Sequence, residues 1–352
     1  MKIHAKIAWA AAVFALLFIL SAGASMAAIG DIQAQSGAVY FKAKGAAAWG
    51  LAPKGGKVDV GDRIKTGSDG RALLVLKDKS RLMLGNDTEI EVSEFLLTKK
   101  ERSAVYSVST GKVRAIVAKF SGRSDIKVRT QTGVAGVKGT DFIVMNQGAA
   151  NVYFGKESRV DVSGEGADGT VKLVANKMTE NTSGAAPIEP VNVEPGSPLE
   201  EARAQLEAVT DVAAPVEWEK TGNLPNLLAR WNINYGRYLA ESRRYKEALD
   251  VFHIAVDLTA ISTIQAEAHL EMGTVYALYM NDPRSALVEY NTVIEKYPEL
   301  PFVANALYSA GKINMDIGNK AEAGRLFRRY LDEYPQGRHR ETVEQLLRSL
   351  AE

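Results

Sequence analysis

Two hydrophobic patterns divide the sequence. Between residues 38 and 174, short runs rich in Val, Ile, Leu, Phe and Thr alternate with turn sequences that contain Gly, Asp, Asn and Ser. Runs of this length and spacing predict an all-β sandwich or jelly-roll-like domain. Residues 72–84 predict a central hairpin that is buried on much of both faces. Residues 104–117 predict a second hairpin that turns at Gly111, because glycine accepts a positive φ.

From residue 227 onward the chain repeats a pair of predicted helices. Their small residues recur every 37 or 38 positions, at Gly236, Gly273 and Gly311 in the first helices and at Ala248, Ala286 and Ala323 in the second helices. An aromatic residue follows each alanine by four positions. This pattern resembles tetratricopeptide repeats, in which small residues let helices approach closely and the aromatic fills the gap under the next repeat. The resemblance implies an α-helical superhelix of three repeats and a closing helix. The long period and the Tyr-Pro endings resemble periplasmic repeats such as those of the Tol-Pal-associated coordinator.

The segment between the two patterns is rich in Pro, Gly, Ser and Glu. Residues 181–197 predict a linker, because prolines and glycines disfavour regular structure. The sequence Ser197-Pro198-Leu199-Glu200 is a capping box with proline at the first helical position, so a helix should begin at Pro198. We expect the β-domain and the repeats to fold independently, because the linker offers few apolar residues to bury between them.

The first residues have the features of an export signal. Two lysines precede an apolar run at residues 7–20, and Ser25-Met26-Ala27 fits the small-x-small cleavage rule. We therefore expect cleavage after Ala27 and a periplasmic protein; the alternative is an uncleaved inner-membrane anchor facing the periplasm. The expected organisation is a signal peptide at 1–27, a β-domain at 29–180 with its core at 58–144, a linker at 181–197, a helix and connector at 198–226, and the repeats at 227–352.

Several motifs of the β-domain resemble the FecR domain, a module of bacterial envelope proteins. They are GDRIKTG at residues 61–67, the alternating run at 72–84, and KVRTQTGVAGVKGTDFIV at 127–144. FecR itself carries a cytoplasmic segment that passes a signal to a sigma factor. Only six residues precede the apolar run here, so we expect no such segment. The resemblance implies structural roles for Gly61, Asp62, Gly67, Gly133, Gly136 and Gly139.

Charge is unevenly distributed, although the whole chain carries a net charge of +1. Residues 29–180 carry a net charge of +7, whereas residues 181–352 carry −8. The basic half favours an anionic partner such as a cell-envelope polymer, and export argues against nucleic acid. The alternative is that the basic residues are only solvated strand faces. The candidate ligand residues are Lys112, Arg114, Lys127, Arg129 and Lys138.

The residue types that catalysis commonly needs are scarce in the β-domain. It contains no histidine, and the whole chain contains no cysteine. These absences remove Ser-His, Cys-His and His-ligated metal chemistry from this domain. Residues 133–140 do not form a phosphate loop, because Val137 rather than glycine precedes Lys138. We therefore expect no cofactor, no metal and no enzyme; an enzyme acting on envelope polysaccharide is the weakest alternative.

The concave side of the repeats is a second candidate surface. Counted from the glycine of each first helix, the residues expected to face it are Arg230, Ile233, Arg237, Glu267, Leu270, Thr274, Asn305, Tyr308 and Lys312. Mixed charge with an aromatic residue suits an extended peptide segment. The sequence thus predicts a non-catalytic adaptor whose β-domain binds an envelope component and whose repeats bind a partner protein. The alternative is a membrane-anchored component that senses envelope signals.

Overall fold

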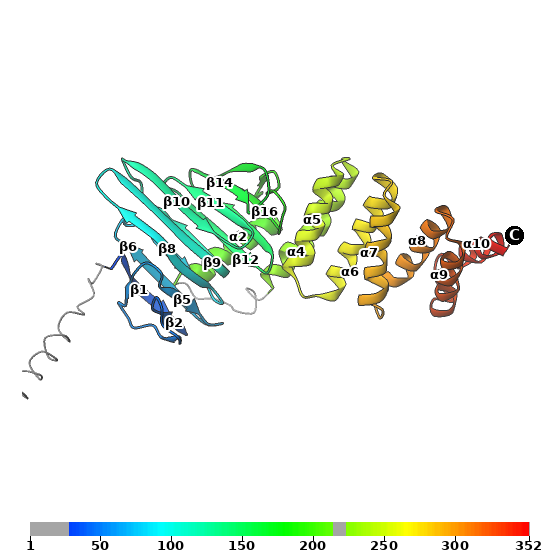
Figure 1. Ribbon diagram of the computed structural model, residues 1–352, viewed down its shortest axis with the longest axis horizontal. Coiled ribbons are helices and arrows are strands. Elements are labelled where there is room, and N and C mark those ends of the chain that lie inside the picture. The colour runs from blue at the N-terminus through cyan, green and yellow to red at the C-terminus, as the bar shows by residue number, and fades with distance from the viewer. Residues whose placement is uncertain (1–27, 214–222, 352) are drawn as a thin grey trace, which may run out of the picture.

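The computed structural model describes residues 28–213 and 223–351. A β-domain and a set of helical repeats lie end to end along one long axis (Figure 1). The expected signal sequence, residues 1–27, lies outside the described residues. No helix within the described ranges combines the length and the apolarity needed to cross a membrane.

Within these ranges, 17 strands form a β-sandwich of two sheets that share strand β9. The first sheet has the order β4 (Lys57–Val58), β1 (Gly30–Ser36), β6 (Arg71–Leu76), β7 (Arg81–Leu84), β9 (Glu101–Ile116), β12 (Asp141–Gln147), β13 (Ala150–Gly155), β16 (Lys177–Asn181) and β17 (Val191–Asn192). The second sheet has the order β3 (Gly50–Leu51), β2 (Val39–Lys42), β5 (Arg63–Thr66), β8 (Glu89–Leu97), β9, β10 (Arg123–Arg129), β11 (Gly133–Val137), β14 (Arg159–Gly164) and β15 (Thr170–Val174). All pairs are antiparallel except β9 with β10.

Strand β9 crosses from one sheet to the other at Gly111. Its residues up to Thr110 pair with β8, whereas its residues from Gly111 pair with β12. The crossing needs glycine, because φ is 102° there and an added Cβ would lie 2.3 Å from the Cα of Thr88. The expected hairpin at 104–117 is therefore wrong: its two segments belong to opposite sheets. The expected hairpin at 72–84 is confirmed by the pairing of β6 with β7.

The main core lies between the two sheets. Strand residues that face inward alternate with outward residues, as the period of two requires. On β9, Ala104, Tyr106 and Val108 point inward from the second sheet, and Val113 and Ala115 point inward from the first. The short alternating runs of the sequence therefore predicted the fold class correctly.

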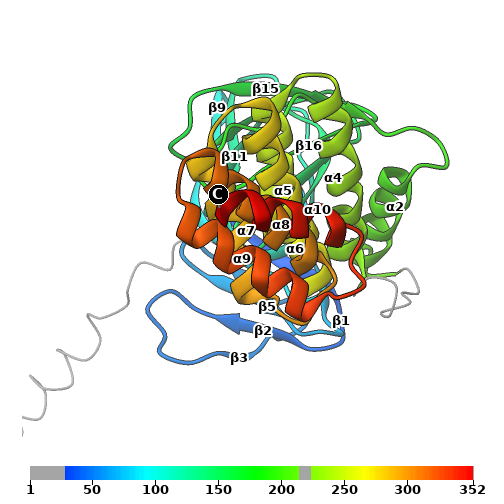
Figure 2. The same ribbon diagram turned by 90° about the vertical axis from the view of Figure 1, so that its right-hand side faces the viewer.

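The outward face of the first sheet is covered by helices. Ile143, Met145 and Phe154 of β12 and β13 form a second core cluster with Leu206 of α2 (Pro198–Thr210) and Leu228 of α4 (Leu224–Glu241). Figure 2, which looks along the long axis, shows α2 beside α4 with the repeats in front of the sandwich. The β-domain and the first repeat thus share one apolar cluster.

The segment expected to be a linker belongs to this shared cluster. Ile188 and Val193 are buried in it, and β17 extends the first sheet. Ser197 caps α2 as expected, because its Oγ accepts a hydrogen bond of 3.2 Å from the backbone N–H of Glu200. Contrary to the sequence-based expectation, the linker does not separate two independent cores.

The helical region contains three antiparallel helix pairs followed by a closing helix among the described residues. They are α4 with α5 (Tyr245–Leu258), α6 (Ser262–Thr274) with α7 (Pro283–Lys296), α8 (Phe302–Asp316) with α9 (Lys320–Glu333), and α10 (Arg340–Ala351). A π-helical turn, η1 (Val275–Tyr279), continues α6. This arrangement confirms the expected superhelix.

Each pair crosses where a glycine meets an aromatic ring. A Cβ added to Gly236, Gly273 or Gly311 would lie 2.4 to 2.6 Å from the ring of Phe252, Tyr290 or Phe327. Each ring therefore packs on the glycine of its own repeat rather than filling the gap under the next one. The alanines at positions 248, 286 and 323 are fully buried.

Candidate binding surfaces

The first helices of the repeats, α4, α6 and α8, lie against one another and line one side of the superhelix. Arg237 of α4 reaches across to α6, where its Nη2 lies 2.7 Å from Glu267 Oε1 and 2.7 Å from Glu271 Oε1. Arg230 also pairs with Glu267. Three expected groove residues thus form one charged network. The sequence-based expectation missed Glu271, although its spacing of four residues from Glu267 places both on one helix face.

The third repeat adds an aromatic site to this side. The ring of Tyr308 on α8 stacks on His339 with 3.9 Å between centroids, and Lys312 Nζ lies 5.7 Å from the Tyr308 centroid. Partial burial, with Arg338 and Lys312 nearby, lowers the pKa of His339. The imidazole is therefore neutral near pH 7 and can stack on the tyrosine without a buried charge. The sequence did not predict this partnership.

The remaining expected groove residues divide into two groups. Leu270, Thr274 and Asn305 are half-buried, and Thr274 Oγ1 donates a 2.9 Å hydrogen bond to the backbone oxygen of Leu270. Ile233 is fully buried in the shared cluster, so its assignment to the groove was wrong. Its side chain lies inside the apolar cluster and does not reach the solvent.

Apolar side chains are exposed where the first two helix pairs turn. Tyr238 at the end of α4 is 59 % exposed and Leu278 of η1 is 72 % exposed. Tyr279 is also exposed and stacks on Tyr245 at the start of α5, with 5.1 Å between centroids. Neighbouring exposed apolar residues are typical of protein contact sites. The sequence-based expectation did not include them, although the aromatic residues stand out in the sequence.

The expected basic face of the β-domain is split between the two sheets. Lys112 and Arg114 lie on the outward face of the first sheet, next to α2. Lys112 is buried, its Nζ donates to Asn86 Oδ1 at 3.1 Å, and burial lowers its pKa. Arg114 donates two hydrogen bonds of 2.9 and 2.6 Å to the carboxylate of Asp141. These two cations therefore stabilise the fold and do not present the solvent-facing ligand surface that we expected.

The other three candidates remain accessible. Lys127 and Arg129 lie on the outward face of the second sheet, and Lys127 pairs with Asp125 at 3.1 Å. Lys138 is exposed in the turn between β11 and β12. Arg129 aligns with Ser107 of β9 and Val134 of β11. Arg129 is exposed at this position.

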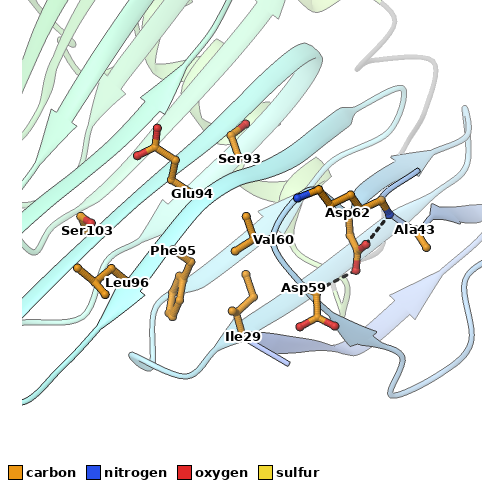
Figure 3. A pocket seen from close by; sticks show the side chains of 11 residues that line it. Ile29, Ala43, Asp59, Val60, Asp62, Ser93, Glu94, Phe95, Leu96 and Ser103 are labelled. Atoms are coloured by element: carbon orange, nitrogen blue, oxygen red, sulfur yellow. Dashed lines mark hydrogen bonds between the residues drawn. The ribbon is translucent and has the colours of Figure 1, made fainter. Parts of the chain in front are cut away.

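A surface cavity of about 720 Å³ lies beside β8 (Figure 3). Ile29, Val60 and Phe95 contribute apolar walls, and Glu94 contributes a carboxylate to the lining. Asp62 is almost completely buried and accepts hydrogen bonds from the backbone N–H groups of Lys44 and Asp59, at 2.9 and 2.8 Å. Its carboxylate therefore holds two loops together, in keeping with the structural role that we expected.

The other glycines singled out for structural roles occupy different settings. Gly61 and Gly139 have φ values of 91° and 104°, which side chains rarely adopt. A Cβ on Gly133 would lie 2.5 Å from the hydroxyl of Tyr153, and one on Gly67 would lie 3.1 Å from the Cβ of Ala38. Gly136 has room for a side chain, because only a backbone oxygen lies within 4 Å of an added Cβ. A steric need for glycine is thus clear at Gly133 and absent at Gly136.

A buried polar contact joins the β-domain to the first repeat. Glu180 of β16 is fully buried, and Asn232 Nδ2 of α4 donates to its Oε2 at 3.2 Å. Burial raises the pKa of Glu180 to about 8, and the hydrogen bond from Asn232 opposes this rise. Beside this pair, Thr182 donates a hydrogen bond to Asp257 of α5. Sequence patterns did not predict either contact, because the paired residues are 52 and 75 positions apart in the chain.

Comparisons with known proteins support both resemblances. The family model for FecR protein matches residues 62–163, and a tetratricopeptide repeat model matches residues 275–338. The chain therefore contains a FecR domain and tetratricopeptide repeats. A search of curated proteins finds no match.

Solved structures match each half of the chain separately. A protein described as an anti-sigma factor from Parabacteroides distasonis is 16% identical, with a TM-score of 0.34; the match covers 41% of this chain and 64% of that chain. The first TPR domain of Spaghetti (RPAP3), bound to an HSP90 peptide, is 15% identical, with a TM-score of 0.30, over 35% of this chain and 90% of that one. The TPR-containing domain of a Plasmodium falciparum FK506-binding protein is 16% identical, with a TM-score of 0.31, over 37% and 89%. At TM-scores of 0.30 to 0.34, these similarities give no information about the function of this chain.

Proposed function

We propose that this protein is a non-catalytic, exported adaptor of the bacterial cell envelope. Its β-domain docks on an envelope component, and the concave side of its repeats binds an extended segment of a partner protein. The presence of a FecR domain and tetratricopeptide repeats supports a signalling or protein-interaction role of this kind.

The observation that carries the proposal is the lining of the concave side. Arg230 and Arg237 are partly exposed and hold Glu267 and Glu271 in fixed positions. Charged side chains that are already ordered lose less conformational entropy when a polar peptide binds them. Tyr308, further along the same side, adds a half-buried aromatic side chain that an apolar residue of the same peptide can contact.

The join between the domains supports an adaptor rather than two loosely tethered binding units. The shared apolar cluster and the buried Glu180–Asn232 pair fix the first repeat on the first sheet. A fixed join sets the distance between a partner held by the repeats and a component held by the β-domain. This geometry is useful when two bound components must be kept at a defined separation.

Photocrosslinking tests the proposal in cells that produce the full chain. A photoreactive phenylalanine analogue replaces Tyr308 on the concave side, and the matched control replaces Val288, an exposed residue of the second helix α7. We expect a discrete crosslinked protein from position 308 and none from position 288. The additional change Arg237→Glu should remove the crosslink, because it places a third carboxylate beside Glu267 and Glu271. Crosslinks only from position 288, or from neither position, would refute binding on the concave side.

A further inference from the structure

Four turns gather at one end of the sandwich, at residues 77–80, 98–100, 117–122 and 138–140. Hydrogen bonds connect them. Ala118 N–H donates to Ser80 Oγ at 3.2 Å, Val117 N–H donates to Thr140 O at 2.8 Å, and Arg123 N–H, just after the third turn, donates to Lys100 O at 2.9 Å. The four turns therefore form one continuous surface, which we call the basic end.

The basic end carries lysines in every turn. All six are exposed: Lys77, Lys79, Lys99, Lys100, Lys119 and Lys138. The side chain of Asp78, the one acidic residue in these four turns, is only 1% exposed, and its Oδ2 lies 3.0 Å from Nη1 of the equally buried Arg102 side chain. Within these four turns the charge presented to solvent is thus positive. Thr140 Oγ1, in the fourth turn, donates to the backbone oxygen of Glu157, so the neighbouring turn at residues 156–158 adds one exposed carboxylate to this end. Just behind the four turns, Glu101 and Asp125 face Arg123 and Lys127.

Apolar side chains accompany the lysines. Leu96 and Leu97, at the end of β8, are 47% and 37% exposed, and Lys99 and Lys100 follow them in the chain. Exposed leucines beside lysines are the combination that binds the interface of an anionic membrane, where apolar groups enter the acyl boundary and cations contact the headgroups. A soluble polyanion would use the lysines and leave the leucines in water.

The chain also enters the β-domain at this end. Ile29 O accepts a 2.8 Å hydrogen bond from Lys77 N–H in the first turn. Eight residues separate Ile29 from the apolar run at 7–20, and such a length spans at most about 30 Å. The repeats extend from the opposite end of the β-domain (Figure 1). In the alternative in which residues 1–27 are retained as an inner-membrane anchor, the anchor would therefore hold the basic end near that membrane and the repeats away from it.

We propose that the basic end binds the anionic phospholipid surface of a membrane and directs the repeats away from it. This inference rests on the proposed function, because it identifies the envelope component that the β-domain contacts. Each lysine close to an anionic bilayer strengthens binding by roughly fivefold. Loss of four of the six lysines should thus weaken the contact by more than about a hundredfold.

The absence of cysteine permits a direct test with one fluorescent label on the chain from Ala28, the expected cleavage product, so that the apolar run at 7–20 does not itself bind the vesicles. Leu97→Cys carries a probe whose emission shifts to the blue in an apolar environment, and Ile317→Cys in the repeats carries the same probe as a control. We expect a blue shift at position 97 on vesicles of phosphatidylglycerol and phosphatidylcholine. We expect no such shift on phosphatidylcholine alone or at position 317, and high salt should reverse the shift.

Two variants with the same change of net charge separate the basic end from overall charge. K79Q/K99Q/K100Q/K119Q should abolish the shift, whereas K54Q/K65Q/K172Q/K320Q, at exposed lysines elsewhere, should keep it. Equal shifts on both lipids, equal losses in both variants, or no shift at position 97 would overturn the proposal. An equal shift with dextran sulfate would assign the surface to a soluble polyanion and also overturn it. Crosslinking from position 308 is also measured in both lysine variants. Loss of lipid binding with crosslinking retained would then be distinguished from loss of the proposed adaptor function.

Discussion

The join between the two domains should lose stability as the pH rises, because a carboxyl group is buried there. Glu180 is fully buried between β16 and α4, and its Oε1 has no hydrogen-bond partner among the described residues. Asn232 Oδ1, on the amide that donates to Glu180 Oε2, is likewise buried without a donor. A proton on Oε1 would supply a donor, and a neutral acid and an amide could then exchange two hydrogen bonds. The structure therefore favours the protonated form of Glu180.

The size and the sign of the effect follow from the shift in pKa. Burial raises the pKa of Glu180 from 4.5 to about 8, so between these values the folded protein keeps a proton that the unfolded chain releases. Stability falls with pH where the folded state binds more protons, by about 1.4 kcal/mol per pH unit. The contribution is fully present below pH 4.5, declines through neutral pH and is lost once the pH passes about 8. The total is on the order of 5 kcal/mol.

Urea denaturation between pH 5 and pH 9 measures this loss. Glu180→Gln keeps the shape and the hydrogen-bonding capacity of the protonated acid but cannot ionise. We expect its stability to match that of the natural chain near pH 5 and to exceed it by several kcal/mol above pH 8. Glu189→Gln, at an exposed carboxylate nearby, is the matched control and should leave the pH dependence unchanged. Identical pH profiles for the natural chain and Glu180→Gln would refute the argument that a buried neutral acid stabilises the join.

Local patterns in the sequence were sufficient for the two fold classes. Alternation along strands and the spacing of Gly236, Gly273 and Gly311 are properties of short segments, so they predicted the sandwich and the helix pairs. The sequence identified Gly111 as a turn residue, but it did not identify the strands with which the two parts of β9 pair. A positive φ suits both a hairpin within one sheet and a crossing between two sheets, and only the pairing of distant strands distinguishes them.

Local sequence patterns could not predict which of the basic strand residues are covered in the fold. Residues two apart on a strand do share a face, as expected for Lys112 with Arg114 and for Lys127 with Arg129. Lys112 and Arg114 are covered because α2 packs next to them and Asp141 pairs with Arg114, and both α2 and Asp141 are distant from them in the sequence. A signal for a covered first sheet did exist. The run at 142–145 is apolar at every position, which indicates a strand buried on both faces.

Two further predictions test the glycine positions that shape the fold, each by the free energy of unfolding in urea. Gly111→Ala should cost more than Gly55→Ala, because both positions have a positive φ but only at Gly111 does an added Cβ meet backbone atoms. The φ strain alone costs about 1–3 kcal/mol, so equal losses would mean that the crossing between the sheets relaxes easily. Gly273→Leu should overpack the middle repeat against Tyr290 and cost about 1–3 kcal/mol. Arg284→Leu, on an exposed position of α7, is the control and should change stability by no more than about 0.5 kcal/mol. Equal losses at these two positions would show that the helices of the middle repeat do not cross at Gly273.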